Sequence, residues 1–208
     1  MGTKERRERE REERRQAILQ AARTIAGEEG WQAVTIRRVA DSVEYSPPTI
    51  YEHFASKDAM LLELMRAGFA SLLEAMQRVS AHAPNPEARV LALAQAYWDF
   101  AWEHPEMYQV MHGLGGVPFC SDSKVPLPEG ALAEADGVYT FTLDALRDVA
   151  PPGMNELENV VIILWATLHG LVALTMADRI DGGRACAAPL VERAVRGVLA
   201  AHLKGATL

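Results

Sequence analysis

The 208-residue chain lacks several features that mark particular classes of protein. It has two cysteines, Cys120 and Cys186, with no CxxC pair, which argues against a disulfide framework and a structural zinc site. It has no Gly-rich phosphate loop, no HExxH and no GxSxG, and its six histidines show no ligand or triad spacing. We therefore expect no metal, no cofactor and no enzymatic activity.

Long apolar runs are also scarce. The nearest candidate for a membrane span, residues 160–177, is interrupted by Trp165, Thr167, His169 and Gly170, so we expect no bilayer-spanning helix. The N-terminus is charged and lacks the apolar core of a signal peptide, which predicts a cytoplasmic protein. Apolar residues make up 49% of the chain, enough for a sizeable core.

Basic charge is not in excess, since the formal net charge is −7. Residues 1–60 hold 11 basic and 11 acidic side chains, whereas the remainder holds 10 and 17. The overall charge argues against a non-specific architectural DNA-binding protein, which relies on many basic contacts. The neutral N-terminal part can still present a local basic face.

Strand-like alternation is absent, and apolar residues recur at helical spacing along the chain, which predicts an all-α protein. Thr35, Ser46 and Ser56 are suitable N-caps for three successive helices. Gly and Pro in residues 113–130 predict a mobile loop. The expected helices cover residues 17–26, 36–43, 47–54, a long segment after Ser56, 87–104, 106–112, 132–149, 155–180 and 189–203.

The arm at residues 1–15 is rich in Arg and Glu. Pairs such as Glu5–Arg9 and Glu10–Arg14 could extend the first helix. A solvated, frayed arm is the favoured interpretation, and an arm that touches DNA phosphates is the alternative.

Two adjacent prolines open the helix expected at residues 47–54. Ser46 serves as its N-cap, and Pro47 falls at the first helical position, where its missing N–H costs nothing. Pro48 still lies in the first turn, where N–H groups have no intrahelical partner. Together with the short helix after Thr35, this gives the spacing of a helix-turn-helix motif.

In such a motif the second helix reads DNA. Its N-terminal residues would reach base edges, and the prolines would favour apolar contact with thymine methyl groups. Thr35, Tyr51, His53 and Lys57 would reach phosphates. The expected DNA contacts are Thr35, Arg37, Arg38, Tyr45, Ser46, Pro47, Pro48, Thr49, Tyr51, His53 and Lys57.

Three stretches, TIRRVAD from Thr35, SPPTIYEHF from Ser46 and SKDAML from Ser56, resemble the N-terminal domain of TetR-family transcriptional regulators. The resemblance covers residues 16–64. Its most specific part is the spacing of Tyr51, Phe54 and Lys57.

The chain differs from the family pattern at one position, and a second segment nearer the C-terminus also resembles the family. Many members of the family have glycine in the turn where this chain has Glu44. Residues 165–170, WATLHG, resemble the Trp-x-x-x-His-Gly signature of one C-terminal subclass.

Membership would imply an all-helical homodimer with a helix-turn-helix DNA-binding domain at residues 1–60 and a larger helical ligand-binding and dimerisation domain at residues 61–208. It would imply a sequence-specific repressor that a small effector releases from a near-palindromic double-stranded operator. An activator, or a regulator that senses no small molecule, could carry the same DNA-binding domain.

The two last helices, residues 156–180 and 189–203, are apolar enough to need a partner. Val191, Ala194, Val195, Val198 and Leu199 form a stripe on the last one. A monomer core is one explanation, and a four-helix dimer interface is the one we favour, given the resemblance.

Aromatic and sulfur-containing residues gather in the middle of the chain and predict a pocket for a small apolar or aromatic effector. Ordinary core packing is the alternative for each residue. His112 and His169 could be polar contacts or structural histidines. The expected effector residues are Tyr97, Trp98, Trp102, Met107, Met111, His112, Phe141, Trp165 and His169.

Overall fold

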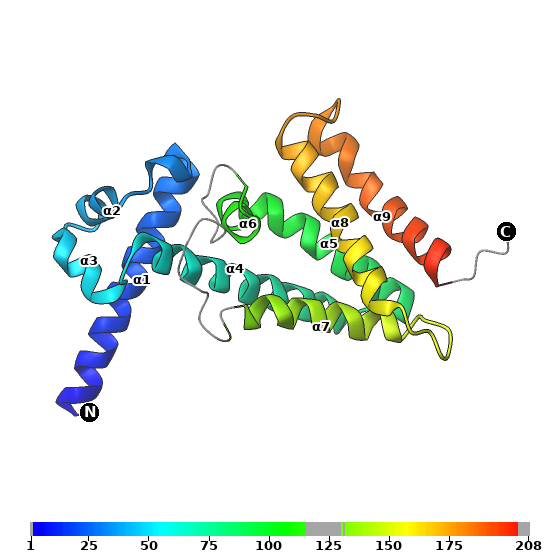
Figure 1. Cartoon of the computed structure of the whole chain (residues 1–208), viewed down its shortest axis with the longest axis horizontal. Helices are drawn as coiled ribbons and strands as arrows, with labels where there is room; N and C mark the ends of the chain where they lie inside the picture. Colours follow the sequence, from blue (N-terminus) through cyan, green and yellow to red (C-terminus); the bar gives the residue numbers. More distant parts are fainter. Residues whose placement is uncertain (1, 115–129, 131, 204–208) are drawn as a thin grey trace. The chain divides into compact units, whose positions relative to one another are not determined.

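The computed structural model describes residues 2–114, 130 and 132–203, and within them every regular element is helical (Figure 1). The predicted all-α fold is therefore confirmed. Most of the loop expected at residues 113–130 lies outside the described residues. The elements are α1 (Thr3–Glu29), a 3-10 turn (Trp31–Ala33), α2 (Ile36–Ser42), α3 (Pro47–His53), α4 (Lys57–Ser80), α5 (Pro86–Glu103), α6 (Pro105–His112), α7 (Ala133–Arg147), α8 (Leu157–Met176) and α9 (Gly183–His202).

Packing divides the chain into two compact units. The head unit comprises Met1–Gly68 and His104–Ala131, and the body unit comprises Phe69–Glu103 and Leu132–Leu208. Helix α4 contributes residues to both units, and α6 belongs to the head unit although it follows α5 in the chain. The division into domains expected at residues 1–60 and 61–208 stays a prediction.

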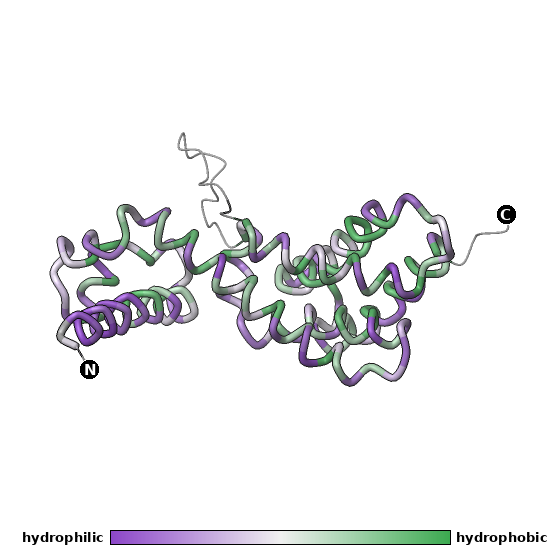
Figure 2. Tube along the Cα trace, turned by 90° about the horizontal axis from the view of Figure 1, so that it is seen from below, coloured by the Kyte–Doolittle hydropathy of each residue, from purple (hydrophilic) through white to green (hydrophobic). Residues whose placement is uncertain are grey.

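Helix α1 extends through the whole N-terminal arm, so the interpretation of a frayed arm is wrong. The reason is that Arg and Glu in blocks place opposite charges four residues apart, where they stabilise a helix. The N-terminal turns of α1 are strongly hydrophilic (Figure 2). Two such pairs are Lys4 with Glu8 at 3.9 Å and Arg6 with Glu10 at 3.5 Å.

The head unit is held together by a small apolar core. Ile18 of α1, Val39 of α2 and Ile50 of α3 are fully buried, and Phe54 closes the far end of α3. Each such side chain contributes on the order of 1.5–3 kcal/mol when buried. Because Ile50 faces this core, the opposite face of α3 is left to solvent.

The body unit is organised around α5, which contacts α7, α8 and α9, while α8 also packs against α7 and α9. One side of α8 is buried in this packing, including Val160, Leu164, Leu168 and Val172. The other side is uncovered: Ile162, Ile163, Trp165 and Leu174 are 52%, 36%, 50% and 51% exposed.

Helix α9 differs from the expectation in two ways. It begins at Gly183, and Pro189 lies inside it, because a proline removes one hydrogen bond without stopping a helix that tertiary packing supports. Its apolar stripe is core of its own chain rather than free for a partner. Val191, Val195, Val198 and Leu199 are all buried.

By length and composition alone, α8 is apolar enough to cross a membrane, because its polar positions are too few to offset its aliphatic residues. The core helix of a protein that does not enter a membrane passes the same test, so this property is weak support for a membrane span.

Candidate nucleic-acid interface

The turn between α2 and α3 depends on Glu44, whose φ is 57°. This left-handed conformation favours glycine because it brings a Cβ close to the backbone. The turn is closed by the Tyr45 N–H, which donates to the Ala40 carbonyl at 2.9 Å. Glu44 thus adopts the backbone conformation that glycine would adopt most easily, and the motif is kept.

The start of α3 presents the predicted prolines to solvent. Pro47 and Pro48 occupy the first turn and are exposed. Ser46 is the N-cap by position, but its hydroxyl bonds the Thr49 hydroxyl at 3.0 Å instead of a backbone N–H. The Thr49 N–H donates to the Ser46 carbonyl at 2.9 Å, and Pro48 has no N–H to offer. Ser46 is therefore the N-cap of α3 as predicted, but its side chain does not supply the capping hydrogen bond.

Tyr51 is a large aromatic side chain of α3 that is 54% exposed. It lies on the solvent side of the helix, away from the buried Ile50. Thr49 and Tyr45 are half-buried, so less of each side chain is accessible to DNA than of Tyr51.

The two arginines of α2 play different parts. The Arg38 guanidinium donates to Glu29 at 2.6 Å, and this hydrogen bond raises the pKa of Arg38. Arg37 is exposed and has no hydrogen bond or ion pair within the described residues. Thr35 accepts a hydrogen bond from the Arg38 N–H at 3.1 Å and so caps α2 as predicted. Arg37 is therefore the α2 guanidinium available for a phosphate.

Lys57 is the first residue of α4 and is half-buried. The turn before it is fixed by Ser56, whose hydroxyl accepts from the Ala59 N–H at 3.0 Å. This cap was predicted, and it sets the direction in which α4 leaves the helix-turn-helix motif.

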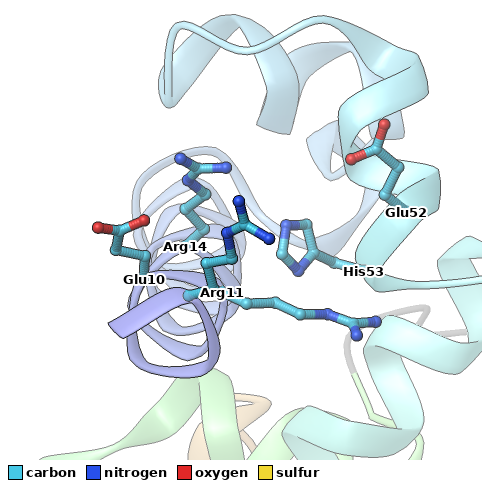
Figure 3. Close-up of a pocket in the computed structure, with 6 residues that line it drawn as sticks. Glu10, Arg11, Arg14, Glu52 and His53 are labelled. Atoms are coloured by element: carbon cyan, nitrogen blue, oxygen red, sulfur yellow. The ribbon is translucent and has the colours of Figure 1, made fainter. Parts of the chain in front are cut away.

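A hollow of about 370 Å³ lies between α1 and the end of α3 (Figure 3). Figure 3 shows arginines of α1 gathered on the side of the helix that faces His53. Burial lowers the pKa of His53, and the positive charge of Arg11 lowers it further. The lining residues are Arg7, Glu10, Arg11, Arg14, Glu52 and His53.

Arg15 links α1 to α3 and to α4 within the head unit. Its guanidinium lies 2.9 Å from the Glu63 carboxylate of α4 and 4.6 Å from the centre of the Phe54 ring. It also donates to the His53 carbonyl at 3.4 Å. None of these contacts was predicted, because their partners are distant in sequence.

Helix α6 is joined to α1 and α4 within the head unit. Glu106 pairs with Arg23 at 2.9 Å, and its carbonyl accepts from the indole N–H of Trp31 at 3.2 Å. Met111 lies over Gly68 of α4 so closely that a Cβ at Gly68 would be 2.6 Å from the Met111 sulfur. Glycine at this position lets α6 and α4 approach each other.

The nine residues expected to contact an effector fall in both units, and their membership of one pocket stays a prediction. Met107, Met111 and His112 belong to the head unit. The other six belong to the body unit: Tyr97, Trp98, Trp102, Phe141, Trp165 and His169.

Within the body unit these six residues have different environments. Tyr97 and Trp98 are buried, and the half-buried Phe141 ring lies 5.1 Å from the Arg89 guanidinium. Trp165 and His169 lie together on α8, with ring centres 6.1 Å apart. Burial lowers the pKa of His169.

Trp102 packs between another tryptophan and an arginine. Its ring is tilted at 58° to the Trp98 ring, with centroids 5.5 Å apart, and the Arg184 guanidinium of α9 lies 5.5 Å from the Trp102 ring centre. Its indole Nε1 is buried and has no hydrogen-bond partner within the described residues. An unsatisfied buried donor costs about 1–3 kcal/mol.

No group of His, Cys, Asp or Glu that could hold a metal ion occurs among the described residues. Comparison with known proteins then decides the assignment. Residues 18–64 match the profile of bacterial regulatory proteins of the tetR family, and residues 90–198 match the tetracyclin repressor-like C-terminal domain. The chain belongs to the TetR family.

Individual relatives agree with this assignment. An uncharacterized HTH-type transcriptional regulator of Mycobacterium tuberculosis is 25% identical over 177 residues, which cover 80% of this chain and 72% of that protein. The HTH-type transcriptional repressor KstR2 of Mycobacterium tuberculosis is 35% identical over 100 residues, 48% of this chain and 49% of KstR2. The solved structure of PfmR, a TetR family regulator from Thermus thermophilus, has a TM-score of 0.62 at 16% identity and covers 92% of this chain and 99% of PfmR. That likeness supports the fold alone.

TetR-family members are DNA-binding transcriptional regulators and not enzymes, and this chain is accordingly a DNA-binding transcriptional regulator. Regulators of this family bind operator DNA and act as dimers that respond to small molecules. The resemblance of residues 165–170 to the Trp-x-x-x-His-Gly subclass stays a prediction.

Proposed function

We propose that this protein is a cytoplasmic, ligand-responsive repressor that binds a near-palindromic operator as a homodimer. The observation that carries the proposal is the first turn of α3, where Pro47 and Pro48 are exposed and Tyr51 follows on the solvent side. The N-terminal residues of a recognition helix contact base edges, and side chains around them contact phosphates.

In this proposal Pro47, Pro48 and Thr49 contact the DNA bases directly. Proline offers no side-chain hydrogen bond, so apolar contact with thymine methyl groups is the favoured means of base recognition. Phosphate contacts fall to Arg37, Tyr51 and the remaining predicted polar residues. Arg37 has no ionic partner within the described residues, which supports a role for it at the DNA backbone.

The proposed dimer interface is the uncovered side of α8, with α9 beside it. Ile162, Trp165 and Leu174 are each about half exposed on this one helix. An apolar surface of this kind is unfavourable in water and marks an interaction site. Two copies related by a two-fold axis would place two recognition helices about one DNA turn, ~34–36 Å, apart.

The proposed effector is a small, mostly apolar or aromatic molecule that carries a hydrogen-bond acceptor. The acceptor is inferred from Trp102, because its buried indole N–H lacks a partner within the described residues. A carbonyl or hydroxyl oxygen of a ligand would satisfy that donor. The nearby Trp98 ring supplies apolar contact area.

The proposed coupling between effector and operator uses α4 and α6. Helix α4 begins at the helix-turn-helix motif and continues into the body unit, so a shift of α4 changes how α3 is held. Helix α6 rests on α4 at Gly68 and is tied to α1 through Glu106. Couplings of this kind are typically ~1–3 kcal/mol, and they are reciprocal, so operator DNA would weaken effector binding by the same factor.

The test is selection of bound sequences from a random duplex library at near-physiological salt, using the purified full-length chain. Enrichment of an inverted repeat with half-sites about one turn apart is the expected result. Absence of any enriched sequence would contradict sequence-specific recognition by α3.

The alternatives of an activator and of a regulator without an effector are separated by a second experiment. A reporter gene placed behind the selected operator should be expressed less in the presence of the protein if it is a repressor. Effector candidates are then screened for release of the operator, with Trp102→Phe as a variant that keeps a ring but removes the N–H donor.

A further inference from the structure

Seven basic side chains lie in the first half of α1. Arg9 interacts with other groups of the protein, and the other six fall into two sets. One set is bound to carboxylates of the same chain: Lys4 to Glu8, Arg6 to Glu10 and Arg15 to Glu63. The other set is Arg7, Arg11 and Arg14, which are exposed and have no ion pair or hydrogen bond within the described residues. Their charges are therefore not neutralised by the protein.

The unpaired arginines lie on a single face of α1, here named the arginine stripe. Residues at i, i+4 and i+7 stack along one side of a helix, and positions 7, 11 and 14 follow that spacing. The stripe borders the hollow beside His53 (Figure 3). Since a helix rises 1.5 Å per residue, the stripe is roughly 10 Å long.

The hollow carries an excess of positive charge. The two carboxylates that line it are Glu10 and Glu52, and Glu10 is already paired with Arg6 at 3.5 Å. Three guanidinium groups thus face a site with one unpaired carboxylate among the described lining residues. Guanidinium groups bind phosphate oxygens through two parallel hydrogen bonds, which makes an anion with several phosphates the natural partner.

We propose that the arginine stripe is a second DNA-binding surface, which holds the phosphate backbone of the duplex beside the bases that α3 reads. The inference rests on the proposed function. DNA is the favoured polyanion because the hollow is bounded by α3 itself, through Glu52 and His53. A length of roughly 10 Å corresponds to about three nucleotide steps along the duplex axis, at ~3.4 Å of rise per nucleotide in each strand.

The stripe has a measurable consequence. Each neutralised phosphate adds about 0.9 to the slope of log K against the logarithm of salt concentration. Removal of two stripe arginines from each subunit of a dimer would lower that slope by about 3.6.

The experiment compares R7Q/R11Q with K4Q/R9Q on the selected operator across a salt titration. Both variants remove two positive charges from the same part of α1, but only the first removes them from the stripe. Glutamine has a helix propensity close to that of Arg and Lys, so circular dichroism should show equal helix content. R7Q/R11Q is expected to lower the slope by several units and K4Q/R9Q by less than one.

Two further measurements make the outcome decisive. Shortened flanking DNA should weaken binding of the unaltered protein and leave R7Q/R11Q unaffected, and R7K/R11K should retain most of the slope. Equal slopes for R7Q/R11Q and K4Q/R9Q, with the preference for the operator intact, would show that the arginine stripe does not bind DNA. The proposed function would be unaffected by that result. Loss of preference for the operator over a scrambled duplex in the unaltered protein would instead overturn the proposed function and this inference with it.

Discussion

The head unit and the body unit expose different chemistry, although both are built from amphipathic helices. On α1 and α3 the exposed side chains include unpaired arginines, prolines and a tyrosine, whereas α8 exposes isoleucine, tryptophan and leucine. Charged groups stay hydrated until an anion replaces the water, but exposed apolar area is unfavourable from the outset. The head surface therefore suits a polyanion, and the α8 surface suits an apolar partner such as a second copy of the chain.

The difference shows why overall charge is a poor guide to this protein. The excess of acidic residues lies after residue 60, outside the helix-turn-helix motif. Within the head unit, ion pairs such as Arg38 with Glu29 and Arg23 with Glu106 consume part of the basic charge in holding the helices together. Within the described residues of the head unit, the basic groups that stay available for phosphates include the unpaired arginines of α1 and α2.

The largest effect is expected from Leu174→Arg on the uncovered side of α8. A two-fold interface would receive the new charge twice, and unpaired buried charges cost several kcal/mol, so the dimer dissociation constant should rise at least ~100-fold. Sedimentation velocity would measure it, with Val79→Arg as a matched change at an exposed apolar residue of α4. A Leu174→Arg protein as dimeric as Val79→Arg would place the interface elsewhere.

Tyr51→Ala should weaken operator binding about tenfold, on the order of 1.4 kcal/mol, by removing a phosphate contact. Because Tyr51 is 54% exposed, the thermal midpoint should barely change. Fluorescence anisotropy with labelled operator measures the loss. Tyr139→Ala, at an exposed tyrosine of the body unit, is the control and should bind as tightly as the unaltered protein.

Gly68→Ala should destabilise the head unit by about 1–2 kcal/mol, because its Cβ would lie 2.6 Å from the Met111 sulfur. Chemical denaturation measures the change, and Met111→Ala in the same chain should recover part of it through a double-mutant cycle. Gly27→Ala in α1, where nothing lies within 4 Å, should be neutral or stabilising. Equal effects at Gly68 and Gly27 would show that the close approach of α6 to α4 is unimportant.

Glu44→Gly should stabilise the protein by about 0.5 kcal/mol. Replacing a residue in the left-handed conformation by glycine raises the free energy of unfolding by about 1–2 kcal/mol, because the steric cost of the Cβ is removed. The greater conformational freedom of glycine in the unfolded chain lowers the free energy of unfolding by about 0.5–1 kcal/mol. Asp178→Gly, at a φ of 53° in the body unit, tests the same principle and should shift the thermal midpoint in the same direction. A lower midpoint for Glu44→Gly would mean that the carboxylate itself stabilises the turn.

The smallest expected effect is the pH dependence caused by His169 in the body unit. Burial lowers the pKa of His169, so the unfolded chain takes up the proton more readily than the folded one. Stability is therefore fully present above about pH 6.5 and declines as the pH falls through the unfolded pKa toward the lower folded value. His169→Gln should reduce, by less than ~1 kcal/mol, the stability lost between pH 7.5 and pH 5.5.

His53 gives the corresponding test in the head unit. Burial and Arg11 both lower the pKa of His53, so His53→Gln should reduce the loss at low pH in the same direction. Urea unfolding at the two pH values measures both histidines. A variant that loses as much stability as the unaltered protein would show that its histidine does not titrate in this range.

Local sequence was sufficient to predict where most helices of this protein begin. Thr35 and Ser56 cap their helices as predicted, and Pro47 begins α3 as predicted. These features depend on groups within about four residues of one another, so no distant contact is needed to produce them. Where local reasoning failed, at the start of α9 and the side chain of Ser46, packing or a neighbouring hydroxyl outweighed the usual preference.

Which surfaces are free depends instead on tertiary packing. Arg7 and Arg15 look alike in sequence, yet Arg15 is bound to Glu63 of α4 and Arg7 is unpaired within the described residues. Helix α6 joins the head unit through Glu106 and Arg23, which are 83 residues apart. Which half of α8 stays uncovered likewise depends on where α7 and α9 pack. Such outcomes are set by contacts between distant segments, and the order of residues along one helix does not reveal them.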